Sequence, residues 1–80
     1  MRLKENIKFR EEFFGGLLFN RNTRKICSVN KTGALIIKMI KKGKTRMEIF
    51  NFLKKKFRLN KTDLKDIENF LIKLEKNNIV

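Results

Sequence analysis

The stretch that decides the fold is Leu17–Lys42, LLFNRNTRKICSVNKTGALIIKMIKK. Its first part predicts a strand hairpin, with a short strand at Leu17–Phe19 and a longer one at Arg24–Val29. Asn20–Thr23 separates the two strands and is rich in residues that tolerate turn geometry. A helix is predicted from Lys31 to Gly43, so the hairpin should lead directly into a helix.

This helix has residues typical of helix termini at both ends. Asn30 is placed to cap its start, and Gly43 is placed to end it. Ile36, Ile37 and Ile40 share one face, and apolar residues on a second face leave mainly lysines for water. We therefore expect the helix to lie in the middle of the domain.

The residues before this stretch predict one more strand. Ile7–Arg10 alternates apolar and basic side chains, which is the pattern of a half-buried strand. Gly15 and Gly16 follow, and we interpret them as a turn or bulge. A phosphate-binding loop is the alternative, but no Lys-Ser/Thr pair follows the glycines. The three strands should form a small antiparallel sheet.

Two further helices are predicted after Gly43. Thr45 and Glu48 have the spacing of a capping box, and Asn60 is placed to cap a third helix whose apolar residues repeat every three and four positions. The predicted fold class is therefore α+β and winged-helix-like, a three-stranded antiparallel sheet followed by three helices. A chain of 80 residues is long enough for one core only, so we expect a single domain over residues 1–80, with residues 1–5 loose.

The composition argues against an enzyme. The chain has no His and a single Cys, so the usual acid–base and nucleophilic pairs are missing. Cys27 lies in an apolar stretch, and we expect a small buried hydrophobe there rather than a nucleophile. We predict no metal and no cofactor. No apolar run is long enough to span a membrane or to act as a signal peptide, so we expect a cytoplasmic protein without membrane contact.

Four segments, in this order and at this spacing, resemble the PqqD-like family, also called recognition elements of ribosomally made, post-translationally modified peptides. The segments that carry the resemblance are Phe14–Phe19, Cys27–Ala34, Ile40–Thr45 and Phe70–Ile79. Members of that family bind the leader segment of a precursor peptide and deliver it to a modifying enzyme, frequently a radical S-adenosylmethionine enzyme. The resemblance thus implies a non-catalytic peptide chaperone.

The resemblance also implies a site, in which the leader adds as a strand beside the third strand and lies against the third helix. On the third helix, Ile72 lies beside the core stripe together with Lys65, Glu68 and Lys76, and we expect this strip to contact the leader. An ordinary surface residue is an equally good explanation of Ile72. Likewise, any three-stranded sheet has two edges, and only the resemblance selects the third strand. The predicted peptide-binding residues are Arg24, Lys25, Ile26, Cys27, Ser28, Val29, Lys65, Glu68, Ile72 and Lys76.

The net charge of +13 supports a different class of function, because basic domains attract nucleic acid. Lys31–Leu59 contains ten basic residues and one acidic residue, whereas Asn60–Val80 contains four of each. A winged-helix reader would place the third helix in the major groove, and that segment has no net charge. We keep nucleic-acid binding as the alternative, interpret Lys54–Lys56 first as a solvated helix face, and consider an acidic leader and a homodimer compatible with the sequence.

Overall fold

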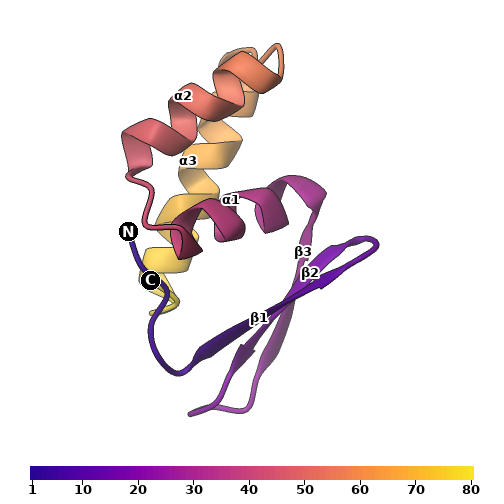
Figure 1. Ribbon diagram of the computed structural model, residues 1–80, viewed down its shortest axis with the longest axis vertical. Helices are drawn as coiled ribbons and strands as arrows, with labels where there is room; N and C mark the ends of the chain where they lie inside the picture. The colour runs from indigo at the N-terminus through magenta and orange to yellow at the C-terminus, as the bar shows by residue number, and fades with distance from the viewer.

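The computed structural model describes residues 1–80 and contains three strands followed by three helices. The strands are β1 (Ile7–Glu12), β2 (Gly15–Asn20) and β3 (Ile26–Asn30). The helices are α1 (Lys31–Lys41), α2 (Arg46–Lys56) and α3 (Lys61–Lys76). Figure 1 shows α1 lying across the sheet, with α2 and α3 extending beyond it. The predicted α+β winged-helix-like fold is therefore confirmed.

The sheet is antiparallel with the order β1-β2-β3, so β1 and β3 are its edges. The turn between β1 and β2 is formed by Phe13 and Phe14, and the two glycines predicted as a turn lie inside β2 instead. Their role is close approach: a Cβ on Gly16 would lie 2.3 Å from the Phe9 ring. Gly15 has φ +144°, a conformation that side chains rarely adopt.

The third strand begins two residues later than predicted. Arg24 has φ +61° and belongs to the turn, as does Lys25, whose backbone N–H donates to the Thr23 hydroxyl at 3.3 Å. The Asn20 side chain accepts from two backbone N–H groups of the same turn. Because Arg24 and Lys25 belong to this turn, the strand itself contains only Ile26–Asn30.

All three predicted helix starts are confirmed. The Asn30 side chain accepts from the Gly33 N–H at 2.8 Å, and the side chains of Thr45 and Asn60 open complete capping boxes on α2 and α3. In the α2 box, the Thr45 backbone N–H donates to the Glu48 carboxylate. This hydrogen bond is the largest cause of a lowered pKa of Glu48, and a hydrogen bond from the Thr45 side chain is the second. Local capping therefore fixes where each helix begins.

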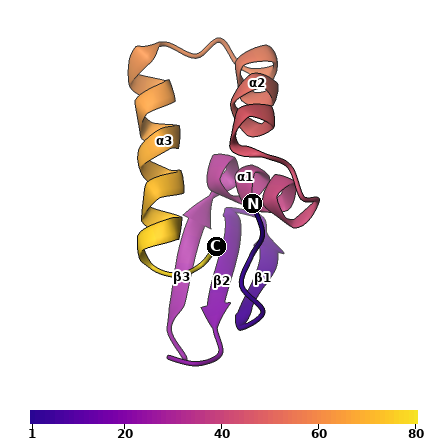
Figure 2. The ribbon, with the colours of Figure 1, turned by 90° about the vertical axis from the view of Figure 1, so that its left-hand side faces the viewer.

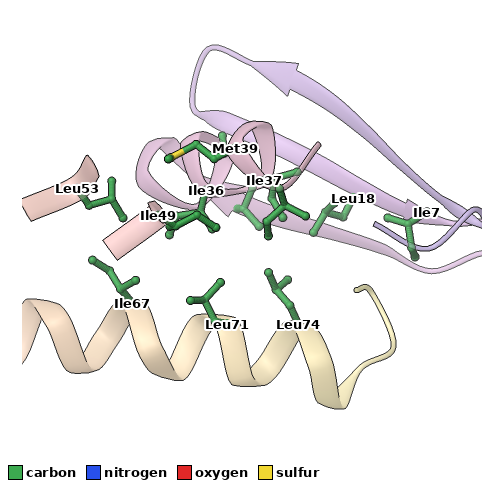
Figure 3. Packing of buried hydrophobic residues seen from close by; sticks show 13 residues of the cluster. Ile7, Leu18, Ile36, Ile37, Met39, Ile49, Leu53, Ile67, Leu71 and Leu74 are labelled. Atoms are coloured by element: carbon green, nitrogen blue, oxygen red, sulfur yellow. The ribbon is translucent and has the colours of Figure 1, made fainter. Parts of the chain in front are cut away.

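One hydrophobic cluster joins the sheet and the three helices. Figure 3 shows Leu71 and Leu74 of α3 pointing toward Ile36 and Ile37 of α1, with Leu18 of β2 beside them. The three isoleucines predicted for the core face of α1 are all buried. The core contains these thirteen residues: Ile7, Leu18, Val29, Ala34, Ile36, Ile37, Met39, Ile40, Ile49, Leu53, Ile67, Leu71 and Leu74.

The N-terminal residues are tied to the rest of the chain, in contrast to the expectation that residues 1–5 are loose. Met1 and Leu3 pack against the core, and the Lys4 N–H donates to the Ile79 carbonyl at 2.9 Å. Both views place the two termini near each other (Figures 1 and 2). The side chains of Met1 and Leu3 explain the difference, because they are apolar and cover part of the core surface. None of the helices is long and apolar enough to cross a lipid bilayer.

Candidate functional site

The free edge of the sheet at β3 is the first part of the candidate site. β3 pairs only with β2, and the Asn20 N–H donates to the Lys25 carbonyl at 2.9 Å. Hydrogen-bonded and non-hydrogen-bonded pairs alternate along an antiparallel ladder, so Cys27 and Val29 direct their backbone groups to β2. Ile26 and Ser28 then direct theirs to the open side. Such an edge is a template for a further strand.

A cleft between β3 and α3 is the second part. Figure 2 shows the C-terminal half of α3 running beside β3. The cleft has a volume of about 250 Å³, and most of its lining is apolar. The lining residues are Leu18, Cys27, Ser28, Val29, Asn30, Phe70, Lys73, Leu74, Asn77 and Ile79. We call this the β3–α3 cleft.

A second depression continues from this cleft toward the start of β3. It has a volume of about 300 Å³ and shares Leu18, Cys27, Asn77 and Ile79 with the β3–α3 cleft. Lys73 lines the first depression and Lys25 the second, whereas no carboxylate lines either. The two together form a continuous, mainly apolar channel along the open edge, with one lysine in the lining of each depression.

Cys27 is exposed, so its prediction as a buried hydrophobe is wrong. The side chain is on the same face of the sheet as Val29, which is buried under the helices, but Cys27 is nearer the end of the sheet where α3 has stopped. Its thiol donates to the Ser28 carbonyl at 3.6 Å. Cys27 therefore lines the site instead of the core.

The other predicted strand residues lie in three different environments. Ile26 is 65% exposed, and Ser28 is also exposed, whereas Val29 is buried. Arg24 and Lys25 lie in the turn before β3, and of these two only Lys25 lines a depression. The structure thus brings five of the six predicted positions to one edge: Ile26, Cys27, Ser28 and Val29 in β3, and Lys25 in the turn before it.

The four predicted helix residues do not line the β3–α3 cleft. Ile72 is 37% exposed, and Lys65, Glu68 and Lys76 are exposed around it. At about 100° per residue the centre of this strip lies about a quarter turn from Lys73 and farther from Phe70 and Asn77. Contact of the strip with a peptide stays a prediction, and the structure places other residues of α3 beside β3.

The cleft residues that sequence reasoning missed have a detectable signal. Phe70 fits the apolar repeat of α3, a pattern typical of core residues, but it is only half-buried and packs at the border of the core and the cleft. Ile79 follows the helix and packs against the core from the C-terminal segment. The detectable signal is the width of the apolar stripe on α3, which is greater than the core requires and includes the side of α3 that lines the β3–α3 cleft.

The site holds no obvious metal ligands, since no group of three or more His, Cys, Asp or Glu side chains is gathered anywhere in the chain. Its chemistry consists of unpaired backbone groups, apolar pockets and lysine ammonium groups.

The fold is shared with proteins of known structure. A lasso peptide synthetase B1 structure, complexed with the leader peptide, is 24% identical, has a TM-score of 0.82, and the match covers 98% of this chain and 93% of that one. TbiB1 in complex with the TbiA(beta) leader peptide is 18% identical with a TM-score of 0.87, and the match covers 99% and 93%. SuiB from Streptococcus suis is 21% identical with a TM-score of 0.60, over 98% of this chain and 22% of SuiB.

At the level of sequence, no curated protein matches this chain. One family model does match, that of coenzyme PQQ synthesis protein D (PqqD), and it covers residues 15–80. The matched region contains β2, β3, the three helices and the whole β3–α3 cleft. The chain belongs to the PqqD family.

Proposed function

We propose that the chain is a recognition element that binds the leader of a ribosomally made precursor peptide as an added strand on β3. The observation that carries this proposal is the open edge of β3 beside an apolar cleft. Backbone groups of Ile26 and Ser28 supply hydrogen bonds that any sequence can make, and the β3–α3 cleft selects side chains. Both components of strand addition therefore occur at one place.

The bound segment has a predictable character. An extended peptide on β3 directs alternate side chains toward α3, where Phe70 and Leu74 offer apolar contact. Lys25 and Lys73, one in the lining of each depression, favour carboxylates. The leader is then a short extended segment with apolar residues at alternate positions and acidic residues beside them.

The structural relatives support this role. Two of them are complexes with leader peptides, and the match in each extends over nearly the whole of both chains. SuiB is matched over 22% of its length and is also seen bound to S-adenosylmethionine. The chain in this role is not an enzyme: it supplies binding, in the cytoplasm, and a separate modifying enzyme, of the radical S-adenosylmethionine class, supplies the chemistry.

Nucleic-acid binding is not favoured. Readout of DNA by α3 would bring Asp66, Glu68 and Glu75 toward phosphates, and the exposed face of α3 carries these acids among its lysines. Titration with a random DNA duplex across a salt series tests this alternative. We expect weak DNA binding that disappears at physiological salt. Tight DNA binding that persists at physiological salt would support the nucleic-acid-binding alternative.

Self-association at β3 would compete with peptide binding. The net charge of +13 opposes contact between two copies, although β3 itself carries no charge. We therefore expect a monomer at micromolar concentration in sedimentation experiments, and a stable dimer that excludes the leader would contradict the proposal.

NMR titration with a synthetic leader peptide, an extended segment of alternating apolar and acidic residues, tests the proposed site. We expect amide shifts at Ile26–Asn30 and at Phe70–Asn77, because these segments border the cleft. Shifts confined to Lys41–Arg58 would contradict it. The strip around Ile72 serves as an internal comparison, since the geometry predicts smaller shifts there.

A further inference from the structure

An aromatic pair is exposed at the tip of the β1–β2 hairpin. Phe13 is 89% exposed and Phe14 is 40% exposed, and their rings meet edge to face with centroids 5.4 Å apart. Figure 1 shows this hairpin tip at the end of the sheet where α1 begins. The core does not need these side chains, and grouped exposed aromatics of this kind mark interaction surfaces more often than scattered ones do.

A groove lies beneath this tip, between β1, α1 and the end of α2. It has a volume of about 460 Å³, which is within the range of about 300–1,000 Å³ typical of ligand clefts. Phe13, Leu35 and Phe57 supply its apolar surface. Three lysines also line the groove: Lys31 at the start of α1, Lys38 within α1 and Lys56 at the end of α2. We call this the hairpin-tip groove.

The charge around the groove is positive after its ion pairs are considered. Glu11 and Glu12 also line it, but Glu11 pairs with Lys38, and Glu12 pairs with Arg10 at 2.6 Å. Lys31 has no ion pair, and Lys56 contacts only the face of an aromatic ring. The groove therefore combines apolar surface with two cations that lack carboxylate partners.

The groove and the β3–α3 cleft share no lining residue. A ligand in one leaves the other open, so the chain is able to hold two partners at once. This arrangement is what an adaptor between a peptide and an enzyme requires.

We propose that the hairpin-tip groove docks the peptide-modifying enzyme, through a surface that presents an aromatic or aliphatic side chain among carboxylates. The inference rests on the proposed function, which makes an enzyme the second partner. Apolar burial supplies affinity, and Lys31 and Lys56 supply charge complementarity and orientation. A second copy of this chain is a poor occupant, because its net charge of +13 opposes approach to a basic groove.

Binding of a purified peptide-modifying enzyme from the same organism tests the docking surface. The test variants are Phe13→Ser and the pair Lys31→Glu with Lys56→Glu. The matched controls are Met47→Ser, an apolar residue that is 68% exposed, and Lys54→Glu, both on α2 but outside the groove. Enzyme affinity is measured by biolayer interferometry, leader affinity by fluorescence polarisation, and folding by circular dichroism.

We expect the groove variants to weaken enzyme binding at least tenfold, since a central aromatic anchor dominates an interface, and to change leader affinity less than twofold. The controls should bind the enzyme like the original chain. Unchanged enzyme binding by folded groove variants overturns the inference, as does a dimer that these variants dissociate. If the original chain does not bind the leader but the groove variants still weaken enzyme binding, the proposed function is overturned instead and the docking surface stays supported.

Discussion

The two edges of the sheet differ in their side chains although their backbones are alike. β1, IKFREE, has four charged residues among six, whereas β3, ICSVN, has none among five. On β1, Arg10 pairs with Glu12, and Glu11 pairs with Lys38 of α1. Charged side chains are a common means of protecting an edge from unwanted pairing. β1 has the composition of a protected edge, and β3 has that of an edge kept open.

The surroundings of the two edges strengthen this difference. Phe70 and Leu74 of α3 form an apolar wall beside β3, whereas a depression along β1 that contains Phe9 and Glu11 is lined mainly by charged residues. Open backbone groups alone attract any strand, but backbone groups beside an apolar wall select one. The comparison therefore predicts that peptide binding is restricted to β3.

The largest expected effect is loss of the sheet geometry that supplies both edges. Gly15 lies in β2 between Glu12 and Asn30, and a Cβ there would be 2.2 Å from the Val29 carbonyl oxygen. Because the strain of φ +144° adds to this clash, we expect Gly15→Ala to lower the free energy of unfolding by roughly 2–4 kcal/mol.

Gly43→Ala is the matched control for Gly15→Ala. Gly43 also has positive φ, at +81°, but nothing lies within 4 Å of a Cβ there. We expect a loss of about 1–2 kcal/mol from strain alone. Urea denaturation of both variants measures the difference, and equal losses would show that close packing of β2 against β3 is not what requires Gly15.

A proline at each edge separates the two edges directly. The Ser28 N–H faces the open side of β3, so Ser28→Pro leaves the ladder to β2 intact but removes a donor for an added strand. We expect leader affinity to fall about tenfold or more, because a hydrogen bond is lost and the ring obstructs the approaching strand.

The same substitution on β1 is the control. The Arg21 N–H donates to the Asn6 carbonyl, and by alternation Glu11 faces away from β2, so Glu11→Pro removes an equivalent open N–H. We expect its leader affinity to change less than twofold in fluorescence polarisation. A larger loss in Glu11→Pro than in Ser28→Pro would reverse the assignment of the two edges.

The smallest expected effect distinguishes two neighbouring lysines of α3. Lys73 lines the β3–α3 cleft, whereas Lys76 belongs to the strip predicted from the sequence. For a leader with acidic residues, Lys73→Glu should weaken binding about three- to tenfold and Lys76→Glu less than twofold, with both effects reduced in high salt. The opposite order in isothermal titration calorimetry would restore the strip around Ile72 as the wall.

The helices were predictable from the sequence because their signals are local. Asn30, Thr45 and Asn60 each cap the helix that follows them, and capping depends on residues within three positions. The positions of Gly15, Gly16 and Cys27 were not predictable in the same way. They depend on which backbone or helix lies opposite them, which is a property of the assembled sheet.

The site was partly predictable for the same reason. The family resemblance selects β3 as the binding edge, which stays a prediction, and projection of α3 on a helical wheel selects a strip that does not line the β3–α3 cleft. A wheel shows which residues share a face, but it does not show on which side of the core stripe β3 lies. Phe70 and Lys73 are on that side, and only the packing of α3 beside β3 reveals it.

Amide hydrogen exchange tests the central claim most directly. The N–H groups of Ile26 and Ser28 face the open side of β3, and those of Phe9 and Glu11 face the open side of β1. On addition of the leader, we predict that exchange at Ile26 and Ser28 slows at least tenfold while exchange at Phe9 and Glu11 is unchanged. Slowed exchange at Phe9 and Glu11, or unchanged exchange at Ile26 and Ser28 in the saturated complex, would contradict strand addition on β3.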